Sequence, residues 1–285
     1  MKSSEVTLLV DIILTSQFLV FLREQGYSKF SIKLGLMSLK WANSFFPQSS
    51  KLDDPFIQRI LSSANRNIVS KKNQKNPLTK ELLAKTLNIS PDAPLRDMRD
   101  ALIISLSFSL LLRNNELRHL SCKHIERKPE GLVFTIVASK TDVFRNGKKI
   151  FLARQTEGFS VVNLLERYLL KANKCFGSNE FLFGPVGQNA IGDPIIKNEL
   201  ISYECCKSIF KTQVEKYGLD PTRYGTHSAR SGGASALAPK VTPFELLLSG
   251  RWADARSLRN YVEVPEARRF DISKNLFIPE PTNIH

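Results

Sequence analysis

The sequence predicts a mainly helical protein with a small β-hairpin sheet, an α+β fold in two domains. Apolar residues recur at helical spacing along most of the chain, and only two short runs, 133–137 and 148–152, have the composition of strands. A polar, lysine-rich stretch interrupts this pattern near residue 73. The length of 285 residues also exceeds the roughly 250 at which a single core stops growing, so we expect two domains.

The first 72 residues predict three helices and no strand. The first helix ends at about Gln25, with Gly26 as its C-cap, and Ser28 caps a second helix that continues through Phe46. Pro55 opens a third helix, which reaches about residue 70.

Positive charge is spread along the whole chain. The net charge is +14, of which +6 falls on residues 1–75. This excess favours a polyanion partner, and nucleic acid over a membrane surface, because no lipid-attachment motif is present. The apolar stretch 6–22 contains polar residues and is too short to span a bilayer. We therefore expect an intracellular protein with no membrane association; a protein that is simply basic is the alternative.

Residues 73–78 are expected to form a basic linker between the two domains. The lysines in and beside it are well placed to follow a phosphate backbone, although such lysines can also be merely solvated. The candidate DNA contacts of this region are Lys71, Lys72 and Lys75.

The second domain begins with Thr79, which caps a helix over 80–87. A long apolar helix is expected from about Leu95 to Arg113, and Glu116 opens a short one. The two strand-like runs follow, with the turn signal Asn146-Gly147 between them. Further helices are expected at about 158–174, 200–216, 227–238, 242–249 and 254–262.

Four segments of this second domain hold residue types that act on phosphodiesters. His227 and Arg230 lie three apart and so share one helix face, and Trp252 precedes Tyr261 by nine residues. Guanidinium groups can hold two phosphate oxygens and stabilise a pentavalent transition state, and a phenol can carry a phosphoryl group covalently. The six candidates are Arg113, Lys140, His227, Arg230, Trp252 and Tyr261.

In this order and spacing, the four segments resemble the tyrosine recombinase (phage integrase) family, with a Cre-like box around Trp252 and Tyr261. The triplet Gly250-Arg251-Trp252 is similar to that of recombinases of eukaryotic mobile elements, of the crypton and DIRS types. The resemblance implies a helical core-binding domain that clamps DNA over residues 1–72, and a tyrosine recombinase catalytic domain over 79–265. Residues 266–285 would form a tail that can contact another protomer.

The resemblance also implies how the scissile phosphate is held. Arg113 and Arg230 match the two arginines that grip it, and His227 matches the histidine that hydrogen-bonds it and assists proton transfer. Trp252 stands where the family has a histidine or tryptophan whose ring N–H donates to a phosphate oxygen. Glu116 matches an acidic position that supports the site.

For the bond exchange, the resemblance implies that Tyr261 forms a 3′-phosphotyrosine while Lys140 protonates the 5′-oxygen that leaves. The covalent link keeps the energy of the phosphodiester, so no ATP, metal or other cofactor is expected. The implied partner is double-stranded DNA, with a homo-tetramer on two DNA sites, a Holliday-junction intermediate, and a monomer or weak dimer off DNA. The protein would lie with chromosomal DNA, in the nucleus of a eukaryote or the cytoplasm and nucleoid of a prokaryote.

The expected function is therefore site-specific DNA recombination in the integration or excision of a mobile element. Two alternatives from other classes are a non-catalytic DNA-binding protein derived from a recombinase and a type IB topoisomerase-like enzyme. Single residues have alternatives too: Arg113 could face a helix dipole, and Lys148 or Lys149 could replace Lys140. A weak metal-site signal, without a second ligand pair, comes from His119, Cys122 and His124.

Overall fold

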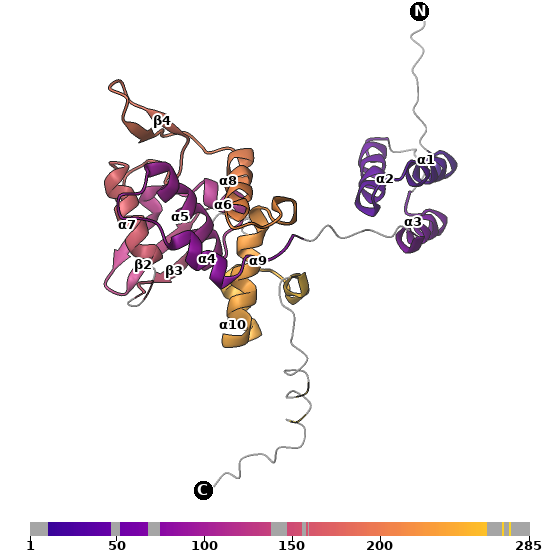
Figure 1. Ribbon diagram of the computed structural model, residues 1–285. Coiled ribbons are helices and arrows are strands. Elements are labelled where there is room, and N and C mark those ends of the chain that lie inside the picture. The colour runs from indigo at the N-terminus through magenta and orange to yellow at the C-terminus, as the bar shows by residue number, and fades with distance from the viewer. Residues whose placement is uncertain are drawn as a thin grey trace, which may run out of the picture. The chain divides into compact units, whose positions relative to one another are not determined.

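The structure is a computed structural model that describes residues 11–46, 52–67, 75–137, 147–155, 158, 160–260, 270 and 274. The chain divides into two compact units, Met1–Asn73 and Gln74–His285 (Figure 1). The fold is mainly helical with small antiparallel sheets, as predicted. None of the helices within these ranges is long and apolar enough to cross a membrane.

The described part of the first unit consists of three helices around a small apolar core. Ser28 caps the second helix, as predicted, by accepting a hydrogen bond from the N–H of Ser31 at 3.1 Å. The buried core residues are Leu19, Ile32, Leu36, Leu52 and Ile57. The helices are α1 (Ile12–Glu24), α2 (Lys29–Asn43) and α3 (Pro55–Asn67).

α2 is apolar on two sides. Ile32 and Leu36 face the core, whereas Trp41 is 69% exposed. The helix ends at Asn43, about three residues earlier than predicted. The hydroxyl of Ser44 donates to the carbonyl of Trp41 at 2.6 Å, and this local bond competes with continuation of the helix.

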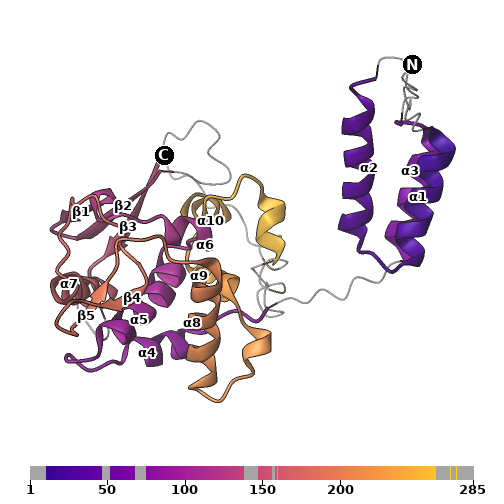
Figure 2. The ribbon, with the colours of Figure 1, turned by 90° about the horizontal axis from the view of Figure 1, so that it is seen from above.

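α5 is the centre of the second unit. It is buried on most sides and packs against α4, α7 and α9 (Figures 1 and 2). Thr79 caps α4, as predicted, by accepting from the N–H of Leu82 at 3.3 Å. The α-helices of the described part are α4 (Lys80–Leu87), α5 (Leu95–Ser109), α6 (Asn114–Arg118), α7 (Val161–Lys171), α8 (Tyr203–Glu215), α9 (Thr226–Leu237) and α10 (Pro243–Gly250). The 3-10 helices are Cys122–His124, Pro221–Arg223, Ala238–Lys240 and Ala255–Asn260.

The predicted hairpin is present as β2 and β3, in which Ile136 pairs with Lys148. A further strand, β1, pairs with β2 to give the order β1-β2-β3, and β4 and β5 form a separate antiparallel hairpin. Sequence periodicity misses these additions because β1 is mostly charged and β4 and β5 have three residues each. The strands are β1 (Ile125–Lys128), β2 (Gly131–Ile136), β3 (Lys148–Ala153), β4 (Val186–Gln188) and β5 (Pro194–Ile196).

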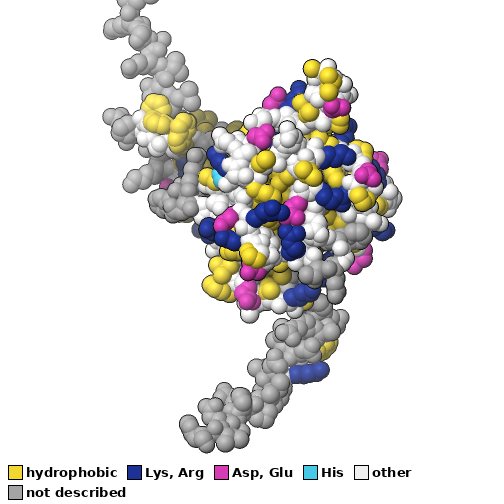
Figure 3. All heavy atoms as spheres, turned by 90° about the vertical axis from the view of Figure 1, so that its left-hand side faces the viewer, with side chains coloured by type: hydrophobic (Ala, Val, Ile, Leu, Met, Phe, Trp, Pro, Cys, Tyr) yellow, Lys and Arg dark blue, Asp and Glu magenta, His cyan; other side chains and the backbone are white. Residues whose placement is uncertain are grey.

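One face of the second unit mixes charges of both signs. Figure 3 looks at the side that carries α7 and the strands, where Lys and Arg side chains are scattered among acidic and apolar ones. Arg127 and Arg154 both pair with Glu166, at 2.7 and 2.8 Å. The hydrogen bond from Arg154 is the main reason that the pKa of Glu166 falls to about 2. Some of the basic side chains on this face are therefore paired within the protein.

Candidate active site

The end of α5 builds one side of the site. α5 stops at Ser109, and Leu111 takes a left-handed backbone conformation (φ 49°) that turns the chain. Arg113 is therefore the N-cap residue of α6, so the interpretation that it sits at the C-terminus of the long helix and faces its dipole is wrong. The carbonyls at the end of a helix lack helical partners, and here those of Leu110 and Leu111 accept from arginines.

Glu116, in the first turn of α6, is the buried acid of the site. Its side chain is 2% exposed and accepts three hydrogen bonds: from the backbone N–H and Nη1 of Arg113, at 2.9 and 2.8 Å, and from Nη2 of Arg251 at 2.7 Å. Burial alone would raise the pKa of Glu116. The charge of Arg251 and the hydrogen bonds from both arginines outweigh burial and hold the pKa below its usual value.

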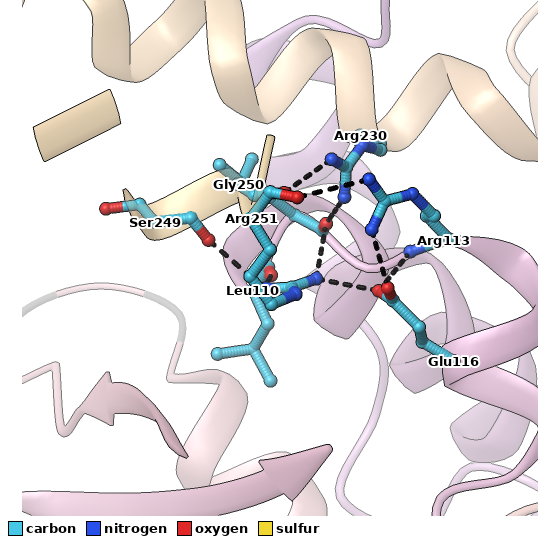
Figure 4. A network of polar contacts seen from close by, with 8 residues as sticks. Leu110, Arg113, Glu116, Arg230, Ser249, Gly250 and Arg251 are labelled. Atoms are coloured by element: carbon cyan, nitrogen blue, oxygen red, sulfur yellow. Dashed lines mark hydrogen bonds and ion pairs between the residues drawn. The ribbon is translucent and has the colours of Figure 1, made fainter. Parts of the chain in front are cut away.

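α9 brings His227 and Arg230 to the end of α5. Gly233 permits this close approach, because a Cβ at that position would lie 2.1 Å from the carbonyl oxygen of Phe108. Arg230 is 1% exposed, and its guanidinium donates to the carbonyl oxygens of Leu111 and Gly250, the latter at 2.5 Å. The α9 helix thus fixes Arg230 against two other segments of the site (Figure 4).

His227 stands one helical turn before Arg230 and remains solvent-exposed. Partial desolvation by the surrounding protein lowers its pKa, and the positive charges of Arg230 and Arg113 lower it further. His227 is therefore neutral near pH 7, so its ring can accept a proton.

The Gly250-Arg251-Trp252 triplet closes the site. The ring centroid of Trp252 lies 4.4 Å from the guanidinium carbon of Arg230, a cation–π contact. A Cβ on Gly250 would lie 1.7 Å from a carbon of the Trp252 ring, so only glycine leaves room for the ring in this position. The family resemblance predicts that the Trp252 N–H donates to a phosphate oxygen, and this stays a prediction. The structure shows the Trp252 ring lying against the guanidinium of Arg230.

Arg251 is a site residue that the sequence analysis missed. Its guanidinium donates to the carbonyls of Leu110 and Ser249, at 3.2 and 3.1 Å, as well as to Leu111 and Glu116. Its backbone carbonyl accepts from Nη2 of Arg113 at 3.2 Å (Figure 4). The available signal is an arginine between a glycine and a tryptophan, and this triplet alone does not indicate the buried contacts of the arginine.

The structure therefore brings together Arg113, Glu116, Arg230 and Trp252, with His227 on the adjacent turn of α9. Lys75 lies in the second unit, where its Nζ donates to the carbonyl of Thr222 at 2.5 Å. Four of the predicted residues fall outside the described part of the chain: Lys71, Lys72, Lys140 and Tyr261.

The weak metal-site signal has no counterpart in the described residues, which hold no group of three His, Cys, Asp or Glu side chains able to bind an ion. His119 instead hydrogen-bonds through Nδ1 to the carbonyl of Asn115 at 2.8 Å. His119, Cys122 and His124 thus form no such group.

Comparison with known proteins places this geometry in a family. Residues 76–268, more than half of the chain, match the profile of the Phage integrase family. The integrase/recombinase xerD homolog of Selenomonas ruminantium is 23% identical over 225 residues, which are 78% of this chain and 64% of that protein. Recombinase cre of Escherichia phage P1 is 24% identical over 175 residues, 59% of this chain and 50% of that protein. The match thus spans under two thirds of either relative.

Solved structures show the same fold at low sequence identity. The Tn1549 transposon integrase in complex with transposon right end DNA gives a TM-score of 0.63 at 19% identity, covering 94% of this chain and 86% of that one. The XerH site-specific recombinase bound to difH substrate gives 0.61 at 16% identity, covering 93% and 70%. With the family profile matched along the whole segment that carries the arginine cluster, the chain belongs to the phage integrase family.

Proposed function

We propose that the protein is a site-specific DNA recombinase that breaks and rejoins strands through a 3′-phosphotyrosine on Tyr261, without metal or ATP. The observation that carries the proposal is the grouping of Arg113, Arg230, His227 and Trp252. Trp252 lies against Arg230, the charges of Arg230 and Arg113 act on His227, and buried Glu116 holds Arg113. Two guanidinium groups and a neutral imidazole in one place suit a phosphodiester, whose developing negative charge they stabilise.

The chemistry divides between these groups and two residues outside the described part of the chain. The phenol oxygen of Tyr261 attacks phosphorus as neutral His227 accepts the phenolic proton, and a P–O bond to tyrosine forms. The P–O5′ bond breaks, and Lys140 gives a proton to the departing oxygen. Attack by the 5′-hydroxyl of another strand reverses these steps, so the energy of the bond is conserved and ATP is not required.

The state of Glu116 supports chemistry without a metal. Divalent ions in phosphoryl-transfer sites need free carboxylate oxygens as ligands. Both oxygens of Glu116 already accept hydrogen bonds from Arg113 and Arg251. In this proposal the positive charge that a metal would supply comes from the arginines.

We assign DNA clamping to residues 1–72, linkage to 73–78, catalysis to 79–265 and contact with another protomer to 266–285. The +6 charge of residues 1–75 supports contact with a phosphate backbone. The λ integrase(75-356) solved as a dimer bound to a COC′ core site is a structural relative, with a TM-score of 0.52. We propose assembly of four protomers on two DNA sites, with a monomer or weak dimer in the absence of DNA.

We further propose that the DNA sites belong to a mobile element, so that the protein works on chromosomal DNA. The Gly250-Arg251-Trp252 triplet supports a likeness to recombinases of the crypton and DIRS types. Similarity to the integrase of transposon Tn1549 supports a role in integration or excision more generally.

The test is covalent capture of DNA. The protein is incubated in EDTA with sheared DNA of its source genome, the mixture is denatured with detergent, and the DNA attached to protein is sequenced. We expect one recurrent site with the wild type and no attached DNA with Tyr261→Phe, which removes only the phenolic oxygen. An adduct that persists in Tyr261→Phe, or one that requires magnesium, would overturn the proposal. Attachment at many unrelated sites with relaxation of supercoiled plasmid would indicate a topoisomerase, and DNA binding without attachment a non-catalytic protein.

A further inference from the structure

Arg251 has a backbone conformation that a bulky residue rarely adopts. It follows the last residue of α10 with φ 55° and ψ 44°, in the left-handed region. Glycine or asparagine is the usual choice at such a helix end, because a Cβ is crowded there. An arginine at this position therefore needs compensating contacts, and they come from its buried side chain.

The Arg251 side chain joins three segments that are distant in sequence. It is 2% exposed and binds the end of α5 through the carbonyls of Leu110 and Leu111, the start of α6 through Glu116, and its own helix through Ser249. Its partner carboxylate is equally buried, at 2% exposure. This ion pair is protected from solvent screening, unlike the surface pairs of the protein.

The backbone that this side chain fixes holds both arginines of the proposed active site. The Gly250 carbonyl accepts from Arg230, and the Arg251 carbonyl accepts from Arg113. The next residue, Trp252, lies with its ring against Arg230. A shift of the triplet would therefore move the acceptors of Arg113 and Arg230 and the ring of Trp252 together.

We propose that Arg251 is a positioning residue: its buried pair with Glu116 locks the Gly250-Arg251-Trp252 backbone and thereby orients Arg113, Arg230 and Trp252 toward DNA. Each Nη of Arg251 already donates to two protein acceptors, so we assign its side chain no contact with the phosphate. The catalytic consequence rests on the proposed function, whereas the structural consequence can be measured without DNA.

The fluorescence emission of Trp252 measures the position of the Gly250-Arg251-Trp252 backbone directly. The chain has two tryptophans, and Trp41→Phe leaves Trp252 as the only one. In this background we compare Arg251→Lys, which keeps the charge but not the fork of donors, and Arg251→Gly, which suits the left-handed backbone but removes the side chain. Arg127→Lys on β1, whose side chain is 62% exposed and paired with Glu166, is the matched control.

We expect both Arg251 variants to fold, by circular dichroism, yet to show a red-shifted Trp252 emission and greater quenching by acrylamide. Arg127→Lys should match the parent protein. Added guanidinium ion at a non-denaturing concentration should restore the parent emission of Arg251→Gly, and the same concentration of sodium chloride should not. If Arg251→Gly does not fold, the Trp252 emission of Arg251→Lys, compared with that of Arg127→Lys, shows whether Arg251 fixes the triplet.

In the cleavage assay, both variants should lose about 10²-fold in the rate of adduct formation, the loss expected from a displacement of about 1 Å, with DNA affinity unchanged. Parent-like Trp252 emission and a parent-like cleavage rate in both variants would overturn the positioning role. A parent protein that forms no adduct would overturn the proposed function instead, and the fluorescence result would still decide whether Arg251 fixes the triplet.

Discussion

Arg230 and Arg251 donate hydrogen bonds to the same atom, the carbonyl oxygen of Leu111. Two guanidinium groups this close repel each other, and Glu116, 2.7 Å from Nη2 of Arg251, supplies the compensating charge. The shared carbonyl belongs to Leu111, two residues beyond the end of α5 at Ser109 and in the left-handed turn that follows the helix, so it takes no part in the helical hydrogen bonds of α5. The arginines are thus held in place before any substrate arrives, which is the arrangement that electrostatic catalysis requires.

Replacing Arg113 or Arg230 with lysine should slow strand cleavage by about 10²- to 10³-fold, the usual effect of losing one preorganised donor. Lysine keeps the charge but cannot bind phosphate in a bidentate manner. At position 230, a single ammonium group also cannot replace the two guanidinium nitrogens that donate to the carbonyls of Leu111 and Gly250. DNA binding should persist. The measurement is single-turnover adduct formation on the captured site, with Arg127→Lys as control. Near-normal cleavage by either variant would contradict the proposed chemistry.

Glu116→Gln should lower the free energy of unfolding of the second unit by about 3 kcal/mol at pH 7, because it leaves buried arginines without their counter-charge. The folded-state pKa of Glu116 lies below the value of about 4.3 in an unfolded chain. The stability that its charge contributes is therefore complete above that pH and is lost as pH falls through the lowered folded-state pKa. The difference between wild type and variant should shrink accordingly.

Urea unfolding of Trp41→Phe protein, followed by Trp252 emission at several pH values between 7 and 3.5, measures this difference. Glu126→Gln is the matched control, because Glu126 forms an exposed pair with Lys128 and its side chain is 53% exposed. Such surface pairs contribute at most about 1 kcal/mol. A Glu116→Gln effect that does not change with pH would show that the carboxylate charge is not what stabilises the site.

Local signals predicted the elements better than they predicted the centre of the site. Ser28 and Thr79 cap their helices as expected, because a capping hydroxyl acts within three residues along the chain. The apolar pattern predicts a helix that continues to Arg113, whereas α5 ends at Ser109. The left-handed turn that follows is at Leu111, and leucine gives no turn signal in a sequence.

The contacts of Arg251 could not be predicted because they join segments about 140 residues apart. Nothing in the local sequence around position 251 indicates that Glu116 and the carbonyls of Leu110 and Leu111, which follow α5, lie beside Arg251. The same holds for β1, whose charged residues have no strand pattern and which forms by pairing with β2. The contacts of Arg251 and the strand β1 therefore both depend on tertiary contacts rather than on local sequence.

Gly250→Ala should displace Trp252 and weaken its contact with Arg230. The added methyl group would lie 1.7 Å from one ring carbon and 2.1 Å from another, and overpacking of this kind costs about 1–3 kcal/mol. In Trp41→Phe protein, the emission of Trp252 should shift to the red, and cleavage should slow. Ser249→Ala is the control, because the neighbouring Ser249 is exposed and contributes its backbone carbonyl to the site. Unchanged emission in Gly250→Ala would refute this account of the glycine.

The pH dependence of cleavage should follow His227. Its pKa lies below the usual 6.5 because of partial burial and the charges of Arg230 and Arg113, so the neutral ring that accepts the tyrosine proton is present at pH 7. The cleavage rate should therefore fall only when the pH drops through that lowered pKa. His227→Gln should abolish this acid limb and lower the rate by about 10²- to 10⁴-fold, the usual contribution of a general base.

The pKa itself can be measured without catalysis, by NMR titration of the imidazole signals of the four histidines, with His227→Gln identifying the relevant one. Arg113→Met removes a positive charge near the ring, so the pKa of His227 should rise toward its usual value. Arg113→Lys, which keeps the charge, should change the pKa less. If Arg113→Met lowered the pKa or left it unchanged, the charge of Arg113 would not be what keeps His227 neutral, and burial and Arg230 would have to account for the whole shift.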